Sequence, residues 1–453
     1  MLSVEANERL TRVGAGTPMG ELMRRYWQPI RPFAQLLDEN VVKVRILGED
    51  LVLFRSTTGK LGLIDSRCPH RQTGLQLGIP DADGLRCAYH GWLMDPSGQC
   101  IDTPLEAKDS NFKIKIKVTA YPVREMGGLV WAYMGPGDPP VLPPWDVFML
   151  PNSIRQIGVV EIPCNWLQCH ENTGDPAHSV WLHGELFKYV LERDGQLGDR
   201  ASNQQMHTLY GRIRTGVGIE SLYARPTEHG MEKGMKYSKA LGADADRVSR
   251  HSTVIFPNMT QVGSASSVRN EMQIRVPIDD THTYHIAYGC YSAPKDVPAP
   301  AQEIIPWYQT PMHDEHGKLI LDYVLAQDAA AWWSQGEITD RSREKLGRTD
   351  TPIILLRRQL DQQARVVEDG GVPMNVFTDP STVPDILHGG LWDTAASNGN
   401  IGTVGQFREA YHKGYGIDDG DRYGPLMPQI IDMMQRIEDS RVPQLSTHSD
   451  SAE

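Results

Sequence analysis

Short apolar runs follow one another closely from residue 41 onward. Val42–Ile46, Leu51–Phe54 and Leu61–Ile64 are typical of strands, and a Thr-Thr-Gly-Lys turn separates the second run from the third. Two further strand-like runs occur at Tyr121–Val123 and Leu129–Met134. We therefore expect a small antiparallel β domain in this part of the chain.

The segment before this domain has a different pattern. Residues 14–20 are rich in glycine, which indicates a loop. Leu22, Met23, Tyr26 and Trp27 follow the loop at helical spacing. We expect a short amphipathic helix over these four residues.

Beyond residue 145 strand-like and helical patterns are mixed. The strand-like runs lie at 210–214, 251–256, 272–276 and 284–288. Helical periodicity returns between about Ile320 and Val366. A last amphipathic helix is indicated by four apolar positions, Ile430, Ile431, Met434 and Ile437. This mixture favours an α+β fold, with an antiparallel sheet flanked by helices, over a parallel α/β fold.

A Pro/Gly-rich stretch over 135–144 is the clearest candidate for a domain boundary. We expect an N-terminal segment over 1–40 that packs on the second domain, an all-β domain over 41–140 and a second domain over 141–440. Residues 441–453 are expected to form a disordered tail.

Length and composition indicate a globular protein of two or three domains. The chain has 453 residues, of which 40% are hydrophobic and 23% charged. Its net charge of -12 argues against nucleic acid or an anionic membrane as the main partner. No signal peptide and no long apolar run is present, so we expect a cytoplasmic protein.

Two cysteine–histidine pairs form the first metal-ligand pattern. Cys68-Pro-His70 is separated by sixteen residues from Cys87-Ala-Tyr-His90, and both pairs fall in expected loops between strands. Rieske 2Fe-2S centres use two cysteines on one iron and two histidines on the other. The six cysteines of the chain show no regular disulfide framework. We therefore interpret these four residues as ligands of a 2Fe-2S cluster.

Two other interpretations of this pattern are weaker. Mixed Cys/His pairs also bind structural zinc, but zinc does not require the Cys-Pro-His-Arg and Cys-x-Tyr-His-Gly-Trp neighbours. The weakest interpretation is that these four residues lie in loops and bind no metal. Cys100 lies outside both pairs, and we expect it to be a small buried or half-exposed residue.

A second pattern of metal ligands lies in the stretch 165–183. His178 and His183 supply two imidazoles, which a mononuclear iron(II) site combines with one carboxylate. Their spacing of five residues exceeds one α-helical turn, so we expect a local helix distortion between them. For His170, outside this pair, we expect a structural role.

Together the two patterns resemble the Rieske non-haem iron aromatic oxygenases. Cys68–Arg71 with Cys87–Trp92 is similar to their cluster motif, and Asn165–His183 is similar to their mononuclear iron motif. The stretches Gly16–Trp27 and Asp340–Gly347 are similar to the branch that contains phthalate dioxygenase and aromatic O-demethylases. The resemblance implies a Rieske domain over 41–140 and a helix-grip-like catalytic domain over 141–440.

In this family the carboxylate ligand comes from a distant helix, for which the chain offers three candidates. We choose Asp328, because it lies in an apolar helical segment and its Gln-Asp context resembles the ligand helix of the family. Asp340 remains a candidate. Asp350 stands just before Pro352 and is more typical of the start of a helix.

The resemblance gives Asp175 a separate role. In the family, the acid three residues before the first histidine ligand joins that ligand to a cluster histidine of a neighbouring subunit. Asp175 is thus expected to relay electrons from His90 of another chain to His178, and it also has the position of a helix cap before Pro176. Asn165 and Glu171 are expected to support the motif near the iron. Such a relay implies a head-to-tail trimer or a hexamer of stacked trimers.

The resemblance implies a terminal oxygenase component that receives electrons from a separate reductase carrying flavin and a ferredoxin-type cluster. The chain has no dinucleotide-binding fingerprint in a strand–helix context. We favour O-demethylation of a methoxylated aromatic acid, including biaryl acids, over dihydroxylation of a phthalate-like acid. An electron carrier or redox sensor is the alternative from another class. Candidate substrate-binding arginines are Arg212, Arg214, Arg247, Arg250 and Arg269, although surface solvation explains most of them.

Overall fold

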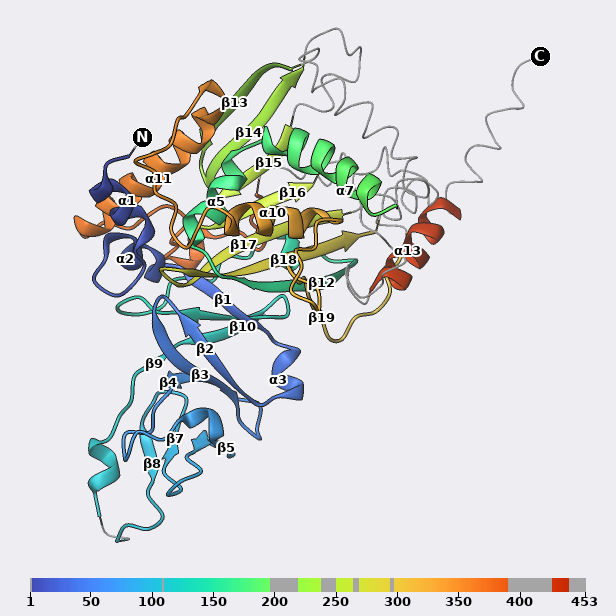
Figure 1. The fold of residues 1–453 in the computed structure, drawn as a ribbon. Helices are drawn as coiled ribbons and strands as arrows, with labels where there is room; N and C mark the ends of the chain where they lie inside the picture. Colours follow the sequence, from blue (N-terminus) through green and yellow to red (C-terminus); the bar gives the residue numbers. More distant parts are fainter. Residues whose placement is uncertain are drawn as a thin grey trace.

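The computed structural model describes residues 2–107, 110–195, 219–237, 250–263, 269–293, 297–389 and 426–439. The described chain forms a large lobe and a smaller lobe that projects from it (Figure 1). The smaller lobe contains β2 to β9, whereas the large lobe is built around one long sheet with helices on it.

The small lobe combines two four-stranded antiparallel sheets. The first has the order β2 (Val41–Ile46), β3 (Glu49–Arg55), β4 (Leu61–Asp65) and β9 (Ala120–Tyr121). The second has the order β5 (Ile79–Pro80), β6 (Leu85–Arg86), β7 (Leu93–Met94) and β8 (Cys100–Asp102). Val52, Phe54 and Ile64 of the first sheet pack against Leu85 and Met94 of the second. The predicted antiparallel β domain is confirmed as far as Tyr121, whereas the run Leu129–Met134 belongs to another sheet and not to this domain.

A three-stranded sheet of β1 (Trp27–Pro32), β11 (Leu129–Tyr133) and β10 (Val123–Met126) lies between the lobes. The predicted helix is α2 (Pro18–Arg24), but it ends before Tyr26, and Trp27 already belongs to β1. Gln28 precedes Pro29, and both residues disfavour a continued helix. The expected helical position of Tyr26 and Trp27 was therefore wrong.

The large lobe contains an eight-stranded sheet in the order β13-β14-β15-β16-β17-β18-β12-β19. All its pairs are antiparallel except β12 with β19. The strands are β12 (Ser153–Ile162), β13 (Ile219–Thr227), β14 (Gly230–Tyr237), β15 (Arg250–Ile255), β16 (Met259–Gly263), β17 (Arg269–Asp279), β18 (His282–Ser292) and β19 (Trp307–Gln309). The expected α+β class is correct.

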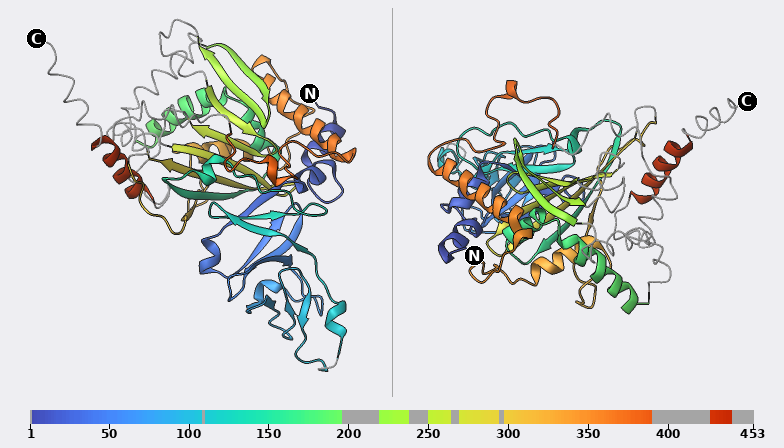
Figure 2. Two further views of the ribbon diagram at one scale, coloured as in Figure 1. Left: turned by 180° about the vertical axis from the view of Figure 1, so that it is seen from behind. Right: turned by 90° about the horizontal axis from the view of Figure 1, so that it is seen from above.

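Helices α5 (Trp166–Gly174), α7 (Phe187–Arg193) and α10 (Val324–Trp333) lie over one face of this sheet (Figures 1 and 2). Strand β17 contacts both α5 and β1. Of these two, β1 lies on the side of the small lobe. The N-terminal α1 (Val4–Thr11) and α2 pack against α11 (Thr351–Glu368), and the last described helix is α13 (Met427–Asp439). The short helices are α3 (Gln35–Asp38), α4 (Asp146–Met149), α6 (His178–Val180), η1 (Leu75–Leu77), η2 (Phe112–Lys115), η3 (Trp181–Leu186), η5 (Arg348–Asp350) and η6 (Pro380–Thr382).

Several expectations cannot be compared with this structure. The strand-like run at 210–214 and the tail over 441–453 lie outside the described residues. The domain limits at residues 40, 140 and 440 stay predictions. None of the helices within the described ranges has the length and apolar character that a membrane span requires.

Candidate metal centres

Two loops of the small lobe carry the cysteine–histidine pairs. Cys68 and His70 lie between β4 and η1, and Cys87 and His90 lie between β6 and β7. The rings of His70 and His90 are 4.5 Å apart, measured between centroids. The structure therefore brings the two pairs, which are distant in sequence, to one place.

The two loops are closed by the same pattern of backbone hydrogen bonds. The Cys68 N–H donates to the carbonyl five residues ahead (2.8 Å), and the Cys68 carbonyl accepts from Gln72 (2.9 Å). Cys87 repeats both bonds, at 2.8 Å and, from Gly91, at 3.0 Å. Gln72 and Gly91 both have positive φ, 61° and 77°, which turns each loop back at the same point. Each loop thus presents its cysteine and its histidine in a comparable way.

Burial separates the thiols from the imidazoles. Cys68 and Cys87 are 1% and 2% exposed, whereas His70 is exposed and His90 half-buried. Burial and the neighbouring Cys87 thiol raise the pKa of Cys68 to about 11. The indole of Trp92 stacks on His70 at 4.5 Å. Two adjacent inner thiols with two adjacent outer imidazoles fit a Rieske cluster, in which one iron takes both sulfurs and the other both nitrogens.

A distorted helix carries the second set of candidate ligands. Asn165 caps the start of helix α5, where its side chain accepts a hydrogen bond from the Leu167 N–H (3.0 Å). After a break at Asp175 the chain continues through α6, the π-helical turn η3 and α7. A π-turn advances about one extra residue over an α-turn. The predicted distortion between His178 and His183 is confirmed, because the π-turn contains His183.

Three side chains converge between α6, η3 and α10. The ligand atoms of His178, His183 and Asp328 all lie within 4.8 Å of one another. The Asp328 Oδ1 is 3.3 Å from His183 Nε2 and 3.7 Å from His178 Nε2. Asp328 is 4% exposed. Two imidazoles and one carboxylate grouped in this way fit a mononuclear iron(II) centre with open positions.

Hydrogen bonds to the other ring nitrogens orient the two imidazoles. His183 Nδ1 lies 2.9 Å from the Gln327 Oε1, and His178 Nδ1 lies 2.6 Å from the Asp175 carbonyl oxygen. Both partners are acceptors, so each Nδ1 carries a proton and each Nε2 is the nitrogen available to a metal. The Nε2 atoms are the atoms that face Asp328, as metal ligation requires.

The charge of Asp328 is balanced by its surroundings. Burial alone would raise the pKa of Asp328, but His183, with His178 and Arg275, lowers it to about 2. The Asn172 amide also donates to Asp328 Oδ1 (3.3 Å). Asp328 is therefore ionised at neutral pH and offers an anionic oxygen to a cation.

Asp175 occupies the break between α5 and α6. Its Oδ1 accepts a hydrogen bond from the Ala177 N–H (2.7 Å), which is the expected capping contact, and its Oδ2 lies 3.7 Å from His178 Nδ1. The Asp175 carboxylate thus lies beside His178, the imidazole to which it is expected to relay electrons.

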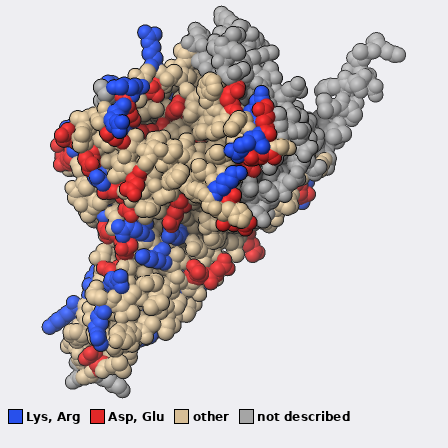
Figure 3. Space-filling view, in the orientation of Figure 1, with Lys and Arg blue, Asp and Glu red and all other residues tan. Residues whose placement is uncertain are grey.

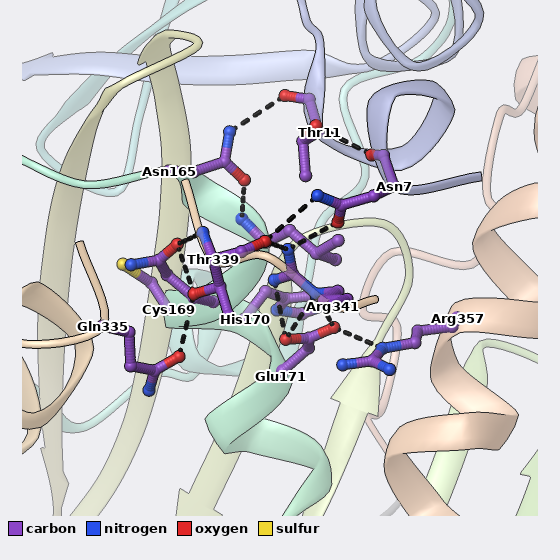
Figure 4. A network of polar contacts seen from close by, with 12 residues as sticks. Asn7, Thr11, Asn165, Cys169, His170, Glu171, Gln335, Thr339, Arg341 and Arg357 are labelled. Carbon is purple, nitrogen blue, oxygen red and sulfur yellow. Dashed lines mark hydrogen bonds and ion pairs between the residues drawn. The ribbon is translucent and has the colours of Figure 1, made fainter. Parts of the chain in front are cut away.

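Glu171 and Asn165 lie in a separate polar network (Figure 4). The two Glu171 oxygens accept hydrogen bonds from Arg341 (2.8 to 3.1 Å) and Arg357 (2.5 Å), and Arg341 is fully buried. The Asn165 amide donates to the Thr11 carbonyl (2.9 Å). Neither side chain is among the three that converge. They tie α5 to the N-terminal segment and to α11.

The comparisons with known proteins decide the family. A Rieske [2Fe-2S] domain model matches residues 26–122. The chain is 37% identical over 388 residues to the oxygenase subunit of 5,5'-dehydrodivanillate O-demethylase from Sphingobium sp., covering 84% of this chain and 85% of that protein. The chain belongs to the oxygenase subunits of the Rieske oxygenase family.

Other Rieske oxygenases agree with this assignment. The oxygenase subunit of phthalate 4,5-dioxygenase from Pseudomonas putida is 34% identical over 394 residues, 79% of this chain and 85% of that protein. NdmA from Pseudomonas putida CBB5, solved with caffeine, superposes with a TM-score of 0.56 at 19% identity, covering 78% of this chain and 94% of that one. The structural likeness concerns the fold alone.

The remaining sequence candidates of this Rieske oxygenase lie elsewhere. Asp340 is exposed and caps a turn by accepting from Ser342, and Asp350 accepts from the Gly347 N–H ahead of α11, as its position before Pro352 predicts. His170 is fully buried and stacks on Trp166. Cys100 is also buried. The described structure includes the backbones of Arg250 and Arg269 but not their side chains, and Arg212, Arg214 and Arg247 lie outside the described residues.

Sequence reasoning missed two residues that contact the triad. Gln327 was visible as the neighbour of Asp328, and Asn172 lies one residue after Glu171 on α5. The two amides contact the triad because of the orientation of α10 and α5 in the fold. The position of a single amide residue in the sequence does not indicate such a contact.

Proposed function

We propose that this oxygenase subunit O-demethylates a methoxylated aromatic acid, with biaryl acids among the candidates, by using dioxygen and externally supplied electrons. The observation that carries the proposal is the 37% identity, over most of both chains, to a subunit that demethylates 5,5'-dehydrodivanillate. The grouping of His178, His183 and Asp328 supports it, because two imidazoles and one carboxylate leave metal positions open for dioxygen beside a substrate.

We assign Cys68, His70, Cys87 and His90 to the 2Fe-2S cluster, and His178, His183 and Asp328 to a mononuclear iron(II) that activates dioxygen when bound. Around the second site the protein supplies orientation. Gln327 and the Asp175 carbonyl hold the Nδ1 protons, and the ionised Asp328 supplies the negative charge. Helices α5 and α10 bury the site against the sheet.

Electron delivery is proposed to run from His90 of one chain to His178 of the next through Asp175. The contact between Asp175 and His178 supports the second half of this path. Around the cluster loops Leu77, Ile79 and Tyr89 are 64%, 59% and 55% exposed. Apolar groups exposed together favour a protein–protein interface. A contact between the small lobe of one chain and the large lobe of another is heterologous and closes as a ring, here a trimer or stacked trimers.

A separate reductase with flavin and a ferredoxin-type cluster is the proposed electron source, and the cytoplasm the proposed location. The missing dinucleotide fingerprint supports a second protein that oxidises NAD(P)H. Charged side chains of both signs are mixed on the face seen in Figure 3, which also shows a broad uncharged area on the small lobe. Docking on such a surface would rest on shape and apolar contact as much as on charge.

Dihydroxylation of a phthalate-like acid is the second candidate. It is favoured by the 34% identity to the phthalate 4,5-dioxygenase subunit. Both reactions need the same metal site, and they differ in which substrate atom faces it.

Two measurements test the proposal. Metal analysis with EPR before and after chelation should give about three irons per chain, whereas an electron carrier would hold about two. A screen of aromatic acids with a reductase, scoring NADH use, oxygen use and formaldehyde, should find formaldehyde released in proportion to substrate. Turnover without formaldehyde would reject demethylation in favour of ring hydroxylation.

A further inference from the structure

One face of the eight-stranded sheet is polar although it is buried. Residues paired directly across neighbouring strands share a face, as do alternate residues along one strand. Lys233 of β14 is the cross-strand partner of Ser252 on β15. Ser252 is opposite Val262 on β16, which in turn is opposite Glu271 on β17. Arg275 lies four residues beyond Glu271 on the same face. Lys233 and Arg275 therefore point to the same side of the sheet.

This side is the one that holds the candidate iron site. Arg275 lies over the ring of Trp332 at 5.5 Å, and the ring of its strand partner His285 is 5.4 Å from that of Trp332. Trp332 is one helical turn beyond Asp328 on α10. Because Lys233 shares this face with Arg275, it also lies on the side of the sheet that carries the triad.

Neither cation has a carboxylate partner among the described residues. Arg275 is 1% exposed, its hydrogen bonds go to Gln273, and its Nε has no acceptor. Lys233 is 5% exposed, and its ammonium makes no hydrogen bond or ion pair within the described ranges. Glu271 reaches Arg275 only through the Gln273 amide (2.5 Å at each step). Buried charges of this kind require a counter-charge.

The nearby acids do not supply that counter-charge. Asp328 is engaged with two imidazoles, and Asp175 caps the turn before α6. Burial lowers the pKa of Lys233 to about 8 and outweighs the fields of Asp175 and Asp328. Burial likewise lowers the pKa of Arg275 to about 10. A carboxylate brought by a ligand would relieve both groups, and it would stand beside the iron site.

We propose that Lys233 and Arg275 form the site that binds the carboxylate of the aromatic acid, and that Lys233 selects acids over neutral analogues. This inference rests on the proposed function for the position of the substrate, but it does not depend on whether the reaction is demethylation or dihydroxylation.

Anaerobic titration calorimetry of the iron-loaded protein tests the proposal without turnover. The probes are vanillate, 5,5'-dehydrodivanillate and phthalate, with vanillamide as the neutral analogue. We expect Lys233→Met and Lys233→Gln to weaken the best acid by about 10- to 100-fold, which is the range for losing one charged hydrogen bond. Lys233→Arg should restore most of the affinity, and vanillamide should bind all variants equally.

The control is Lys318→Met, which removes an exposed lysine from a turn and should bind like the natural protein. Arg275→Lys keeps the charge but loses the planar guanidinium, so it should weaken the acid less than Lys233→Met does. Iron content and thermal melting of every variant show whether the fold is kept.

Three results would overturn the proposal: no carboxylate probe binds the natural protein, Lys233→Met binds the acids normally, or the variant loses acid and amide affinity alike. A variant with normal acid affinity but slow electron transfer from the cluster would instead make Lys233 a positioning residue for Asp175. Acid binding that depends on Lys233, with turnover that releases no formaldehyde, would reject demethylation and support the carboxylate site.

Discussion

At the scale of single residues, the amide of Gln327 decides how His183 presents its ring. Its Oε1 accepts the Nδ1 proton, and its Nε2 donates to the Leu321 carbonyl (2.7 Å), so the amide cannot turn over without losing both bonds. Because Gln327 and Asp328 are neighbours on α10, one helix sets both the carboxylate and the orientation of an imidazole.

Gln327→Leu should therefore weaken the mononuclear iron site without affecting the cluster. We expect about a 10- to 100-fold loss of iron(II) affinity, which is the usual cost of removing a partner behind a metal ligand. Anaerobic iron(II) titration measures the loss, and the visible spectrum reports the cluster. Gln335→Leu, which changes an exposed amide just beyond α10, is the control. Equal iron affinity in both variants would show that Gln327 does not orient His183.

Glu171 should make the stability of the protein depend on acid pH. Burial alone would raise the pKa of Glu171, but Arg341 and Arg357 hold it below its ordinary value of 4.5. The unfolded chain then takes up the proton first, so the contribution of Glu171 is complete above pH 4.5 and is lost as the pH falls through the folded value.

Glu171→Gln should lower the free energy of unfolding by about 3 kcal/mol at pH 7, because it leaves Arg341 buried without its partner. Below pH 4.5 the melting temperature of the variant should fall less steeply than that of the natural protein. Melting curves from pH 3 to 7 measure both effects, with the exposed Glu315→Gln as control. Parallel curves for the variant and the natural protein would contradict the predicted pKa.

Residues whose chemical type indicates a metal ligand could be predicted from the sequence. Residues whose role depends on the direction of their side chain could not. Cysteine, histidine and aspartate at informative spacings led to the groups that the structure brings together, although three acids remained open until α10 placed Asp328 beside both histidines. Lys233 gave no such signal, because a lone lysine in a strand is usually exposed. Only the register of β14 in the sheet shows that it points inward.

At the scale of elements, the π-helical turn η3 matches the spacing of the two histidines to the metal site. In a regular α-helix a spacing of five would rotate His183 well away from the face of His178, whereas the wider turn brings the rings to 5.2 Å. At a spacing of five, the two histidines therefore need the wider turn to share a face.

Inserting one alanine after Trp181, which is 61% exposed, should raise the spacing of the two histidines to six and rotate His183 by about 100° away from the face of His178. We expect the mononuclear iron to be lost while the cluster stays, so that the content falls from about three irons per chain to about two. Trp181→Ala changes the same turn but keeps the spacing, and it should retain the iron. Loss of iron in both variants would point to disturbance of the turn and not to the spacing.

Strands with local apolar patterns could also be predicted, as β2, β3, β4, β15, β17 and β18 show. Short strands could not, because β5, β6 and β7 have only two residues each and exist through pairing in the folded lobe. Trp27 was assigned to a helix because its spacing fits, but the prolines that follow and its bond to the Pro140 carbonyl (2.9 Å) place it in a strand.

At the scale of the whole molecule, the two candidate centres lie in different lobes (Figure 1). Among the described elements, no extensive contact joins the cluster loops to the helices that carry the triad. The proposed electron path through Asp175 therefore calls for a second chain.

Mixed oligomers should reveal that path. A chain with Asp328→Ala keeps the cluster but lacks the iron ligand, and a chain with Cys87→Ser lacks the cluster but keeps the iron site. Neither should turn over alone, whereas a 1:1 mixture assembled together should regain about a quarter of the natural activity, the share of junctions that join an intact cluster to an intact iron site in a randomly filled ring. The two chains carry different affinity tags, so that mixed trimers can be isolated before assay; in these one junction of three is intact, and about a third of the natural activity is expected. Isolated mixed rings without activity would show that electrons do not cross between chains, and the role of Asp175 would then have to be sought within its own subunit.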